Sequence, residues 1–286
     1  MSYVDQIDRL YGYLTVKETV DFAFQCSYGG SHRGPFSTEG PEIESLIKEL
    51  DSKGWLVDII LRGVGLKRVE DTFVGNDRVR GVSGGEKKRV TVGEMMATPT
   101  FVSCYDEIST GLDAITTFDI CKLLGSVTRM RSTVTLVSLL QPPPETVALF
   151  DEIIFIDGGR ILFAGPVDEV IIHFKNLGYM QPERVDPIDW LQSLPTKDGS
   201  KFLTGSENGA NFTSKELAQK YQESKHGQEM REKLATPQAT DTDPKQILNQ
   251  DRVKKRYANS VNRSIKIVFV RELLLWWRDK YAIKAR

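Results

Sequence analysis

The sequence predicts an α/β fold with a largely parallel sheet over residues 1–195. Short apolar runs alternate with segments of helical periodicity along this range, which is typical of strands joined by crossover helices. Residues 100–105 and 133–140 are strand-like and flank a helical segment at 116–131, so together they predict a βαβ unit. Because the run at 133–140 (TVTLVSLL) is almost wholly apolar or β-branched, we expect it to be buried on both faces.

A β-hairpin is predicted after this unit. Residues 153–156 and 160–163 are apolar runs that flank Asp157-Gly158-Gly159. Glycine adopts positive φ without steric cost, as a tight hairpin turn requires.

Two further segments have a distinct character. Residues 41–63 are helical in period, and we expect an inserted helical subdomain at about 41–95. Residues 196–250 are polar and rich in turn-forming residues, which predicts a linker with one helix at 214–235.

Composition and charge exclude several classes of protein. The 38 Lys and Arg residues balance 39 Asp and Glu residues, so the whole chain is not a binder of polyanions. Three scattered cysteines without a CxxC pair exclude a disulfide framework or a zinc ribbon. No run reaches the 18 or so apolar residues that a membrane-spanning helix requires, so we expect no segment to cross a bilayer unaided.

A serine and two glycines precede a predicted helix start. Ser83, Gly84 and Gly85 leave backbone N–H groups exposed at a helix N-terminus, where a phosphate or another anion is favoured. An ordinary helix N-cap with a glycine turn is the alternative, but it does not explain the run Glu-Lys-Lys-Arg that begins at Glu86. The motif therefore predicts an anion site.

Two adjacent acids follow the predicted strand at 100–105. Successive side chains of a strand point in opposite directions, so Asp106 can hold Mg²⁺ through water while Glu107 faces an attacking water. A solvated turn is the common alternative for such a pair. The position of Asp106, 23 residues after Ser83, and the nearby Asp113 favour a phosphoryl-transfer site.

The order of these features resembles the nucleotide-binding domain of ATP-binding cassette (ABC) transporters. It is most similar to the first such domain of the full-length G subfamily, the pleiotropic drug resistance type, strongly over residues 1–195 and more loosely over 251–286. The resemblance rests on four segments: Gly75-Asn76-Asp77, the run RGVSGGEKKR at 80–89, the run DEISTGLD at 106–113, and Leu149-Phe150-Asp151. It implies a partial P-loop NTPase-like ATPase fold with a parallel sheet core and an inserted helical subdomain.

The resemblance also implies ATP and Mg²⁺ as ligands, and a role for each motif residue. Gln6 corresponds to the Q-loop glutamine that senses Mg²⁺ and the γ-phosphate, Asp106 to the Walker B aspartate on Mg²⁺, and Glu107 to the general base. Asp113 corresponds to the D-loop contact across a dimer. The signature motif that binds the γ-phosphate of ATP on a second nucleotide-binding domain is formed by Ser83, Gly84, Gly85 and Glu86.

Two departures from the family pattern bear on activity. The sequence contains no GxxxxGK[ST] loop, and we expect this to reflect truncation before Gln6. Leu140 stands where the family has its switch histidine, and leucine cannot hydrogen-bond a γ-phosphate. We therefore expect the isolated chain to be inactive, and its signature motif to serve ATP bound by the partner domain.

The C-terminal segment 251–286 carries eleven Lys and Arg residues against three Asp and Glu. A helix with Trp276 and Trp277 among cations suits a membrane interface, where aromatic rings lie at the headgroups. The cations expected to face anionic lipid are Arg271, Arg278, Lys280 and Lys284. A helix packed on its own domain is the alternative, whereas adjacent tryptophans in a leucine-rich run argue against nucleic acid.

These inferences predict a domain of an ABC exporter that couples ATP hydrolysis to transmembrane transport at the cytoplasmic face of a membrane. On this interpretation 251–286 is the basic amphipathic connecting helix that leads to a transmembrane domain absent from the sequence. Its partners would be a second nucleotide-binding domain and the transmembrane domains of the same transporter. A soluble ABC-type ATPase and a non-catalytic fragment are the alternatives.

Overall fold

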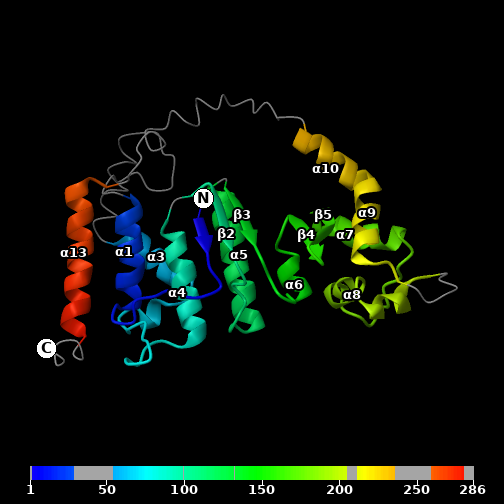
Figure 1. Cartoon of the computed structure of the whole chain (residues 1–286). Coiled ribbons are helices and arrows are strands. Elements are labelled where there is room, and N and C mark those ends of the chain that lie inside the picture. The colour runs from blue at the N-terminus through cyan, green and yellow to red at the C-terminus, as the bar shows by residue number, and fades with distance from the viewer. Residues whose placement is uncertain are drawn as a thin grey trace. The chain divides into compact units, whose positions relative to one another are not determined.

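The computed structural model describes residues 2–28, 54–98, 100–131, 133–204, 211–235 and 259–279 (Figure 1). The chain divides into two compact units, the first formed by Met1–Leu140 with Leu248–Arg286 and the second by Gln141–Ile247. Residues 41–53 of the predicted helical subdomain, and 236–250 of the predicted linker, lie outside the described residues.

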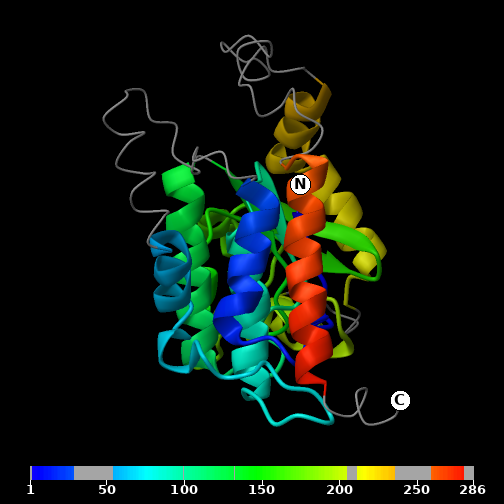
Figure 2. The same cartoon turned by 90° about the vertical axis from the view of Figure 1, so that its left-hand side faces the viewer.

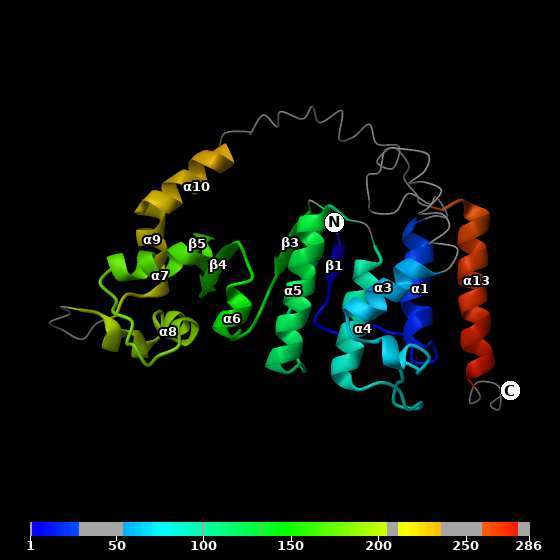
Figure 3. The same ribbon diagram turned by 180° about the vertical axis from the view of Figure 1, so that it is seen from behind.

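A three-stranded parallel sheet forms the centre of the first unit. Strands β1 (Ser2–Val4), β2 (Val102–Tyr105) and β3 (Val134–Val137) lie in this order, with Val4 opposite Tyr105 and Tyr105 opposite Val137. Helix α5 (Ala114–Arg131) connects β2 to β3 and packs against the sheet (Figure 3). The predicted mixed α/β fold and its βαβ unit are confirmed.

The expectation that the run at 133–140 is buried on both faces is wrong. Alternate side chains of β3 are exposed, with Val134 at 56% and Leu136 at 46%. The elements that pack most closely on β3 in the described part of the chain are β2 and α5, which cover one edge and one face. The continuous run of apolar residues therefore predicts more burial of the β3 side chains than the structure has.

Helices surround the sheet of the first unit. Helix α1 begins with a capping box, because Thr15 Oγ1 accepts the Glu18 N–H (3.2 Å) and the Glu18 carboxylate accepts the Thr15 N–H (2.9 Å). Its apolar residues Val16 and Val20 are fully buried. Helix α1 spans Val16–Tyr28. The other described elements between it and β2 are α3 (Trp55–Gly63), η1 (Lys67–Val69) and α4 (Gly84–Met96).

A tight loop leads into α4. Gly75 has φ +81°, and a Cβ on Gly81 would lie 2.2 Å from the carbonyl oxygen of Val74. Only glycine fits this close backbone approach. The side chain of Asn76 closes the turn by accepting the N–H groups of Arg78 and Val79 at 2.9 and 3.0 Å.

Helix α13 (Val261–Arg278) packs along α1 (Figure 2). Arg278 donates to both carboxylate oxygens of Glu18, at 2.6 and 2.9 Å. The guanidinium of Arg271 lies 4.8 Å from the ring centre of Tyr11 and 4.5 Å from that of Phe22. Cation–π contacts and a bidentate ion pair therefore hold the helix to its own unit.

These contacts correct part of the sequence interpretation. Arg271 and Arg278 face α1 instead of a lipid surface, and Lys280 and Lys284 lie outside the described residues. The opposite side of α13 leaves apolar side chains exposed, among them Phe269, Trp276 and Trp277 at 62, 55 and 73%. The helix is thus packed on its own unit and amphipathic at once.

The second unit is built on an antiparallel hairpin of β4 (Glu152–Asp157) and β5 (Arg160–Pro166). Gly158 and Gly159 both have positive φ, as predicted from the sequence. Its helical elements in the described residues are α6 (Pro144–Val147), α7 (Val167–Asn176), α8 (Pro187–Ser193), η2 (Lys197–Phe202), α9 (Ser214–Glu223) and α10 (Lys225–Ala235).

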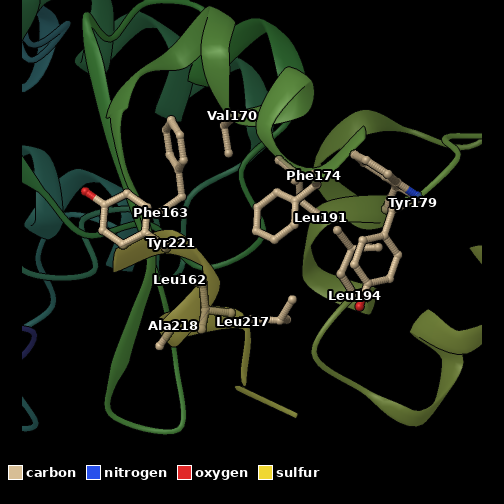
Figure 4. Close-up of a cluster of buried hydrophobic side chains, with 11 residues drawn as sticks. Leu162, Phe163, Val170, Phe174, Tyr179, Leu191, Leu194, Leu217, Ala218 and Tyr221 are labelled. Atoms are coloured by element: carbon tan, nitrogen blue, oxygen red, sulfur yellow. The ribbon is translucent and has the colours of Figure 1, made fainter. Parts of the chain in front are cut away.

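The segment predicted to be one solvated helix at 214–235 consists of two helices divided at Ser224. Helix α9 buries Leu217, Ala218 and Tyr221 in the core of the second unit, beside Phe163 and Phe174 (Figure 4). The predicted domain boundary at 195 therefore falls inside a compact unit. Charged residues on the outer face of α9 concealed this short buried stripe in the sequence.

Candidate nucleotide and metal site

The carboxyl ends of the three parallel strands meet at one edge of the sheet. Gln6 follows β1, Asp106 and Glu107 follow β2, and Ser138 follows β3. The N–H of Asp106 is held by the carbonyl of Val4 at 3.0 Å, which fixes the start of the acidic turn. Ligands of open α/β sheets bind at such an edge.

The side chains of the two acids have different partners. Nε2 of Gln6 donates to Glu107 Oε2 at 2.5 Å, and the Thr110 hydroxyl lies 3.5 Å from the same oxygen. Glu107 has φ +45°, a region that non-glycine residues rarely occupy. Its N–H donates to Ser138 Oγ at 2.8 Å, which supports this strained turn.

Both oxygens of Asp106 accept hydrogen bonds. Ser138 Oγ donates to Oδ1 at 2.7 Å, and the Tyr3 hydroxyl donates to Oδ2 at 2.7 Å. These two donors, with the charge of Lys88 adding to them, hold the pKa of Asp106 below its usual value. The hydrogen bond between the Tyr3 hydroxyl and Asp106 raises the pKa of Tyr3. Asp106 is therefore an anion at neutral pH and is presented in a fixed orientation.

The motif at Ser83 begins helix α4, as the sequence predicts. Ser83 is the N-cap and forms a capping box with Glu86: the Ser83 N–H and hydroxyl both lie 2.9 Å from Glu86 Oε2, and the Glu86 N–H lies 3.3 Å from Ser83 Oγ. The Ser83 N–H lowers the pKa of Glu86. The predicted anion site is thus occupied by the protein's own carboxylate.

Gly84 and Gly85 differ in their surroundings. A Cβ on Gly84 would meet no atom within 4 Å, whereas one on Gly85 would lie 3.3 Å from the Leu112 side chain and 3.4 Å from the Gly111 carbonyl. The turn that precedes α5 therefore lies against the start of α4. Asp113 ends this turn, and its carboxylate accepts the Thr116 N–H at 3.4 Å. Hydrogen bonding by the Thr116 side chain, with a smaller effect of this N–H, lowers the pKa of Asp113.

Three residues of the site were not identified from the sequence. They are Tyr3, Ser138 and Lys88, which contact the sheet edge from β1, β3 and α4. A sequence pattern could have identified Lys88, because the apolar residues Val92 and Met96 follow it at intervals of four residues, which places all three on one face of α4. In the structure this face is buried. Leu140, in contrast, is 69% exposed.

A metal ion bound at this edge of the sheet would need ligands in addition to protein side chains. The part of the chain that the structure describes contains no cluster of three or more acidic, histidine or cysteine side chains able to hold a metal ion. Mg²⁺ commonly binds through one or two protein oxygens together with phosphate oxygens and water. The oriented Asp106 carboxylate fits this mode of binding.

Comparison with curated proteins gives relatives along nearly the whole chain. It is 36% identical to ABC transporter G family member 31 of Arabidopsis thaliana, over 98% of this chain and 21% of that protein. It is 35% identical to pleiotropic drug resistance protein 1 of Nicotiana tabacum, over 98% of this chain and 20% of that protein. The chain thus spans about a fifth of the length of these relatives.

A family model described as "ABC-2 type transporter" matches residues 140–273. This is a membrane-domain family, and its match begins after the acidic sheet edge, so the predicted nucleotide-binding domain at 1–195 overlaps it only in part. Among the described helices, none has both the length and the apolar character needed to cross a bilayer.

The Arabidopsis thaliana relative is named as a transporter and the Nicotiana tabacum relative as a drug resistance protein. The family match and these names together indicate association with a membrane. Over nearly its whole length, the chain is therefore homologous to a segment of ABC transporters of the G family, including the pleiotropic drug resistance type.

Proposed function

We propose that this chain is part of an ATP-hydrolysing domain of a G-family ABC exporter, in which ATP hydrolysis drives transport across a membrane. The observation that carries the proposal is the sheet edge, where Gln6, Asp106, Glu107 and Ser138 are joined by direct hydrogen bonds. Phosphoryl transfer needs positioned charge and a positioned water more than covalent chemistry from the protein, and these residues suit that task.

Asp106 and Gln6 are the residues that would hold Mg²⁺. When bound, the ion neutralises charge that develops on the transferred phosphate. Asp106 contributes a carboxylate that is ionised at neutral pH and fixed by two donors. Gln6 contributes an amide whose nitrogen already donates to Glu107, so its carbonyl oxygen is the atom left for a cation.

Glu107 is the residue that would orient the attacking water and accept its proton. The Gln6 amide holds Oε2 of this carboxylate at 2.5 Å, which leaves Oε1 as the acceptor for a water. Restraint of the carboxylate by Gln6 and by the strained backbone lowers the entropy cost of reaching a productive geometry.

The start of α4 would serve a second ATP site. Ser83 and Gly84 are exposed at a helix N-terminus, and Asp113 lies on the adjoining turn. A second nucleotide-binding domain that presents ATP here would find backbone N–H groups as donors, and the Ser83 hydroxyl would join them after leaving the Glu86 carboxylate. The transmembrane domains of the same transporter are the other proposed partners, with the chain at the cytoplasmic face.

A second candidate is a chain that completes the partner's site without hydrolysing ATP itself. It is favoured by Leu140, whose exposed apolar side chain offers no hydrogen bond to a γ-phosphate. In this case the isolated chain hydrolyses ATP at background rate. A Mg²⁺-dependent turnover that disappears in Glu107→Gln would instead establish hydrolysis at its own sheet edge.

Vanadate-sensitive ATPase activity of the intact transporter in lipid separates the two roles. We expect Ser83→Arg to abolish activity, because it fills the donor site that faces the partner's ATP. Glu107→Gln should keep a large part of it, and Leu140→His should raise it little. Removal of one donor from a preorganised phosphate site typically lowers the rate about a hundredfold. Equal loss in Ser83→Arg and Glu107→Gln would mean that both sites must hydrolyse ATP.

A further inference from the structure

Lys88 is a charged side chain in the interior of the first unit. Its residue is 2% exposed, although it lies on a helix whose neighbouring Lys87 and Arg89 are only half-buried. A buried ammonium is costly unless hydrogen bonds replace its water. The partners that provide this replacement therefore show what the residue holds.

These partners belong to the loop that follows β1. Nζ of Lys88 lies 3.0 Å from the carbonyl oxygen of Gln6, 3.3 Å from that of Asp5 and 3.6 Å from Oδ1 of Asp8. Thr91, one turn further along α4, donates its hydroxyl to the same Asp8 oxygen at 2.7 Å. Two positions of one helix thus hold three residues of the loop, Asp5, Gln6 and Asp8.

This attachment fixes Gln6 at both ends. Its backbone carbonyl is bound to α4 through Lys88, and its side-chain amide is bound to Glu107 at 2.5 Å. The helix that carries Lys88 begins with the capping box of Ser83, five residues earlier. A shift of α4 therefore changes the position of Gln6 relative to Glu107.

We propose that Lys88 is a positioning residue that binds the backbone of Asp5 and Gln6 to α4, so that the motif at Ser83 and the amide of Gln6 move as one body. An event at the N-terminus of α4 is then transmitted to the acidic sheet edge. The physical link is a buried cation with two carbonyl acceptors and one carboxylate at ion-pair distance. The effect of this link on ATP hydrolysis rests on the proposed function, whereas the attachment of the loop to α4 does not.

Cleavage of the native chain by an arginine-specific protease measures the link directly. Arg9 follows the held loop and its side chain is 79% exposed, so cleavage after it reports local opening of the loop. Lys88→Met keeps the length and apolar stem of the side chain but removes the charge. We expect cleavage after Arg9 to become about tenfold faster, since charge-assisted hydrogen bonds are lost.

Three controls accompany this variant. Lys87→Met changes an adjacent cation on the same helix and should leave cleavage after Arg9 unchanged. Lys88→Arg keeps a cation and should restore most of the protection. Cleavage after Arg62, which is exposed at the end of α3, should not change in any variant. An unchanged rate after Arg9 in Lys88→Met, or an equal rise in Lys87→Met, would overturn the proposal.

If Lys88→Met accelerates cleavage at both Arg9 and Arg62, the unit has lost global stability, and Thr91→Val then decides. This nearly isosteric change removes only the hydroxyl that orients Asp8. A selective rise at Arg9 in Thr91→Val supports the link, and no rise there refutes it.

The Mg²⁺ dependence of ATP hydrolysis by the intact transporter tests the catalytic consequence. Lys88→Met should raise the half-saturating Mg²⁺ concentration several-fold, and it should add little in a Gln6→Ala background, because the two residues act in series. Additive effects in the double variant would overturn the assignment of Lys88 to Gln6. If the transporter hydrolyses no ATP, the proposed function fails while the protease result for the link stands.

Discussion

The hydroxyl of Ser138 joins the two acids of the sheet edge. It donates to Asp106 Oδ1 and accepts the N–H of Glu107, so one small side chain orients a carboxylate and supports a strained backbone. No feature of the run TVTLVSLL distinguishes this serine from an ordinary strand residue. Its role depends on the parallel pairing of β2 and β3, which places the ends of the two strands together.

Ser138→Ala should therefore change the acid beside it. We expect the pKa of Asp106 to rise toward its usual value, since Ser138 is the main donor that lowers it. Carboxyl ¹³C NMR during a pH titration of the chain measures this pKa directly. Ser138→Thr keeps the hydroxyl and should leave the pKa low. An unchanged pKa in Ser138→Ala would assign the control of the Asp106 pKa to Tyr3 and the charge of Lys88.

His173 in the second unit predicts a pH dependence of stability. Its ring lies 5.3 Å from that of Phe163 and 5.1 Å from that of Phe174, and burial lowers its pKa to about 4, with His226 adding a smaller effect. Between pH 6.5 and 4 the unfolded chain binds a proton that the folded chain does not. Stability therefore falls as the pH falls through this window, by an amount on the order of 2 kcal/mol.

Urea unfolding of the second unit at pH 7 and pH 4.5 measures this effect. His173→Phe removes the titrating ring and should flatten the dependence, although other groups that titrate below pH 5 will keep their share. His226→Gln is the matched control, because the His226 ring meets that of Phe163 edge to face at 5.8 Å and is less buried than His173. A dependence that follows His226 instead of His173 would contradict the argument.

At the scale of elements, short sequence patterns correctly predicted turns and helix starts, which are determined by interactions between neighbouring residues. The hairpin turn followed from Gly158 and Gly159, and the start of α4 from Ser83, because turn and capping preferences act over a few residues. The burial of β3 and the position of α9 depend on which elements pack against them. That information is spread over the chain, and the buried Lys88 shows that even a charged residue can belong to an inner face.

The loop before α4 allows a prediction with an internal control. Gly81→Ala would place a Cβ 2.2 Å from the Val74 oxygen and 2.4 Å from Gly75, so the backbone must move. We expect a loss of stability of about 2 kcal/mol or more. Gly84→Ala has open space around its Cβ and should be neutral. Thermal unfolding of both variants checks this, and comparable losses would show that Gly81 is not sterically restricted.

At the scale of the molecule, the apolar side of α13 is a surface without cover in the described residues. The predicted membrane contact of 251–286 must use this side, because Arg271 and Arg278 are engaged with α1. We expect the chain to sediment with anionic vesicles more than with neutral ones. Binding should weaken with salt, since exposed charges are screened over about 8 Å at physiological ionic strength.

A variant in which Trp276 and Trp277 are both serine tests the apolar part of this contact. It should bind anionic vesicles less well than the wild type at every salt concentration, because the aromatic anchors are lost. Equal sedimentation with both kinds of vesicle, or with neither, would remove the membrane-interface interpretation of this helix.

The contact between α1 and α13 has a consequence for how the chain acquires its structure. Glu18 and Arg278, which form an ion pair, are 260 positions apart in the sequence. All residues of the second unit come between them along the chain. At translation rates of 5–20 residues per second, α13 leaves the ribosome roughly 10–50 s after α1. During this delay α13 is not yet available to cover the side of α1 that it contacts in the folded unit. The second unit, whose core is continuous in sequence, is complete before the first one.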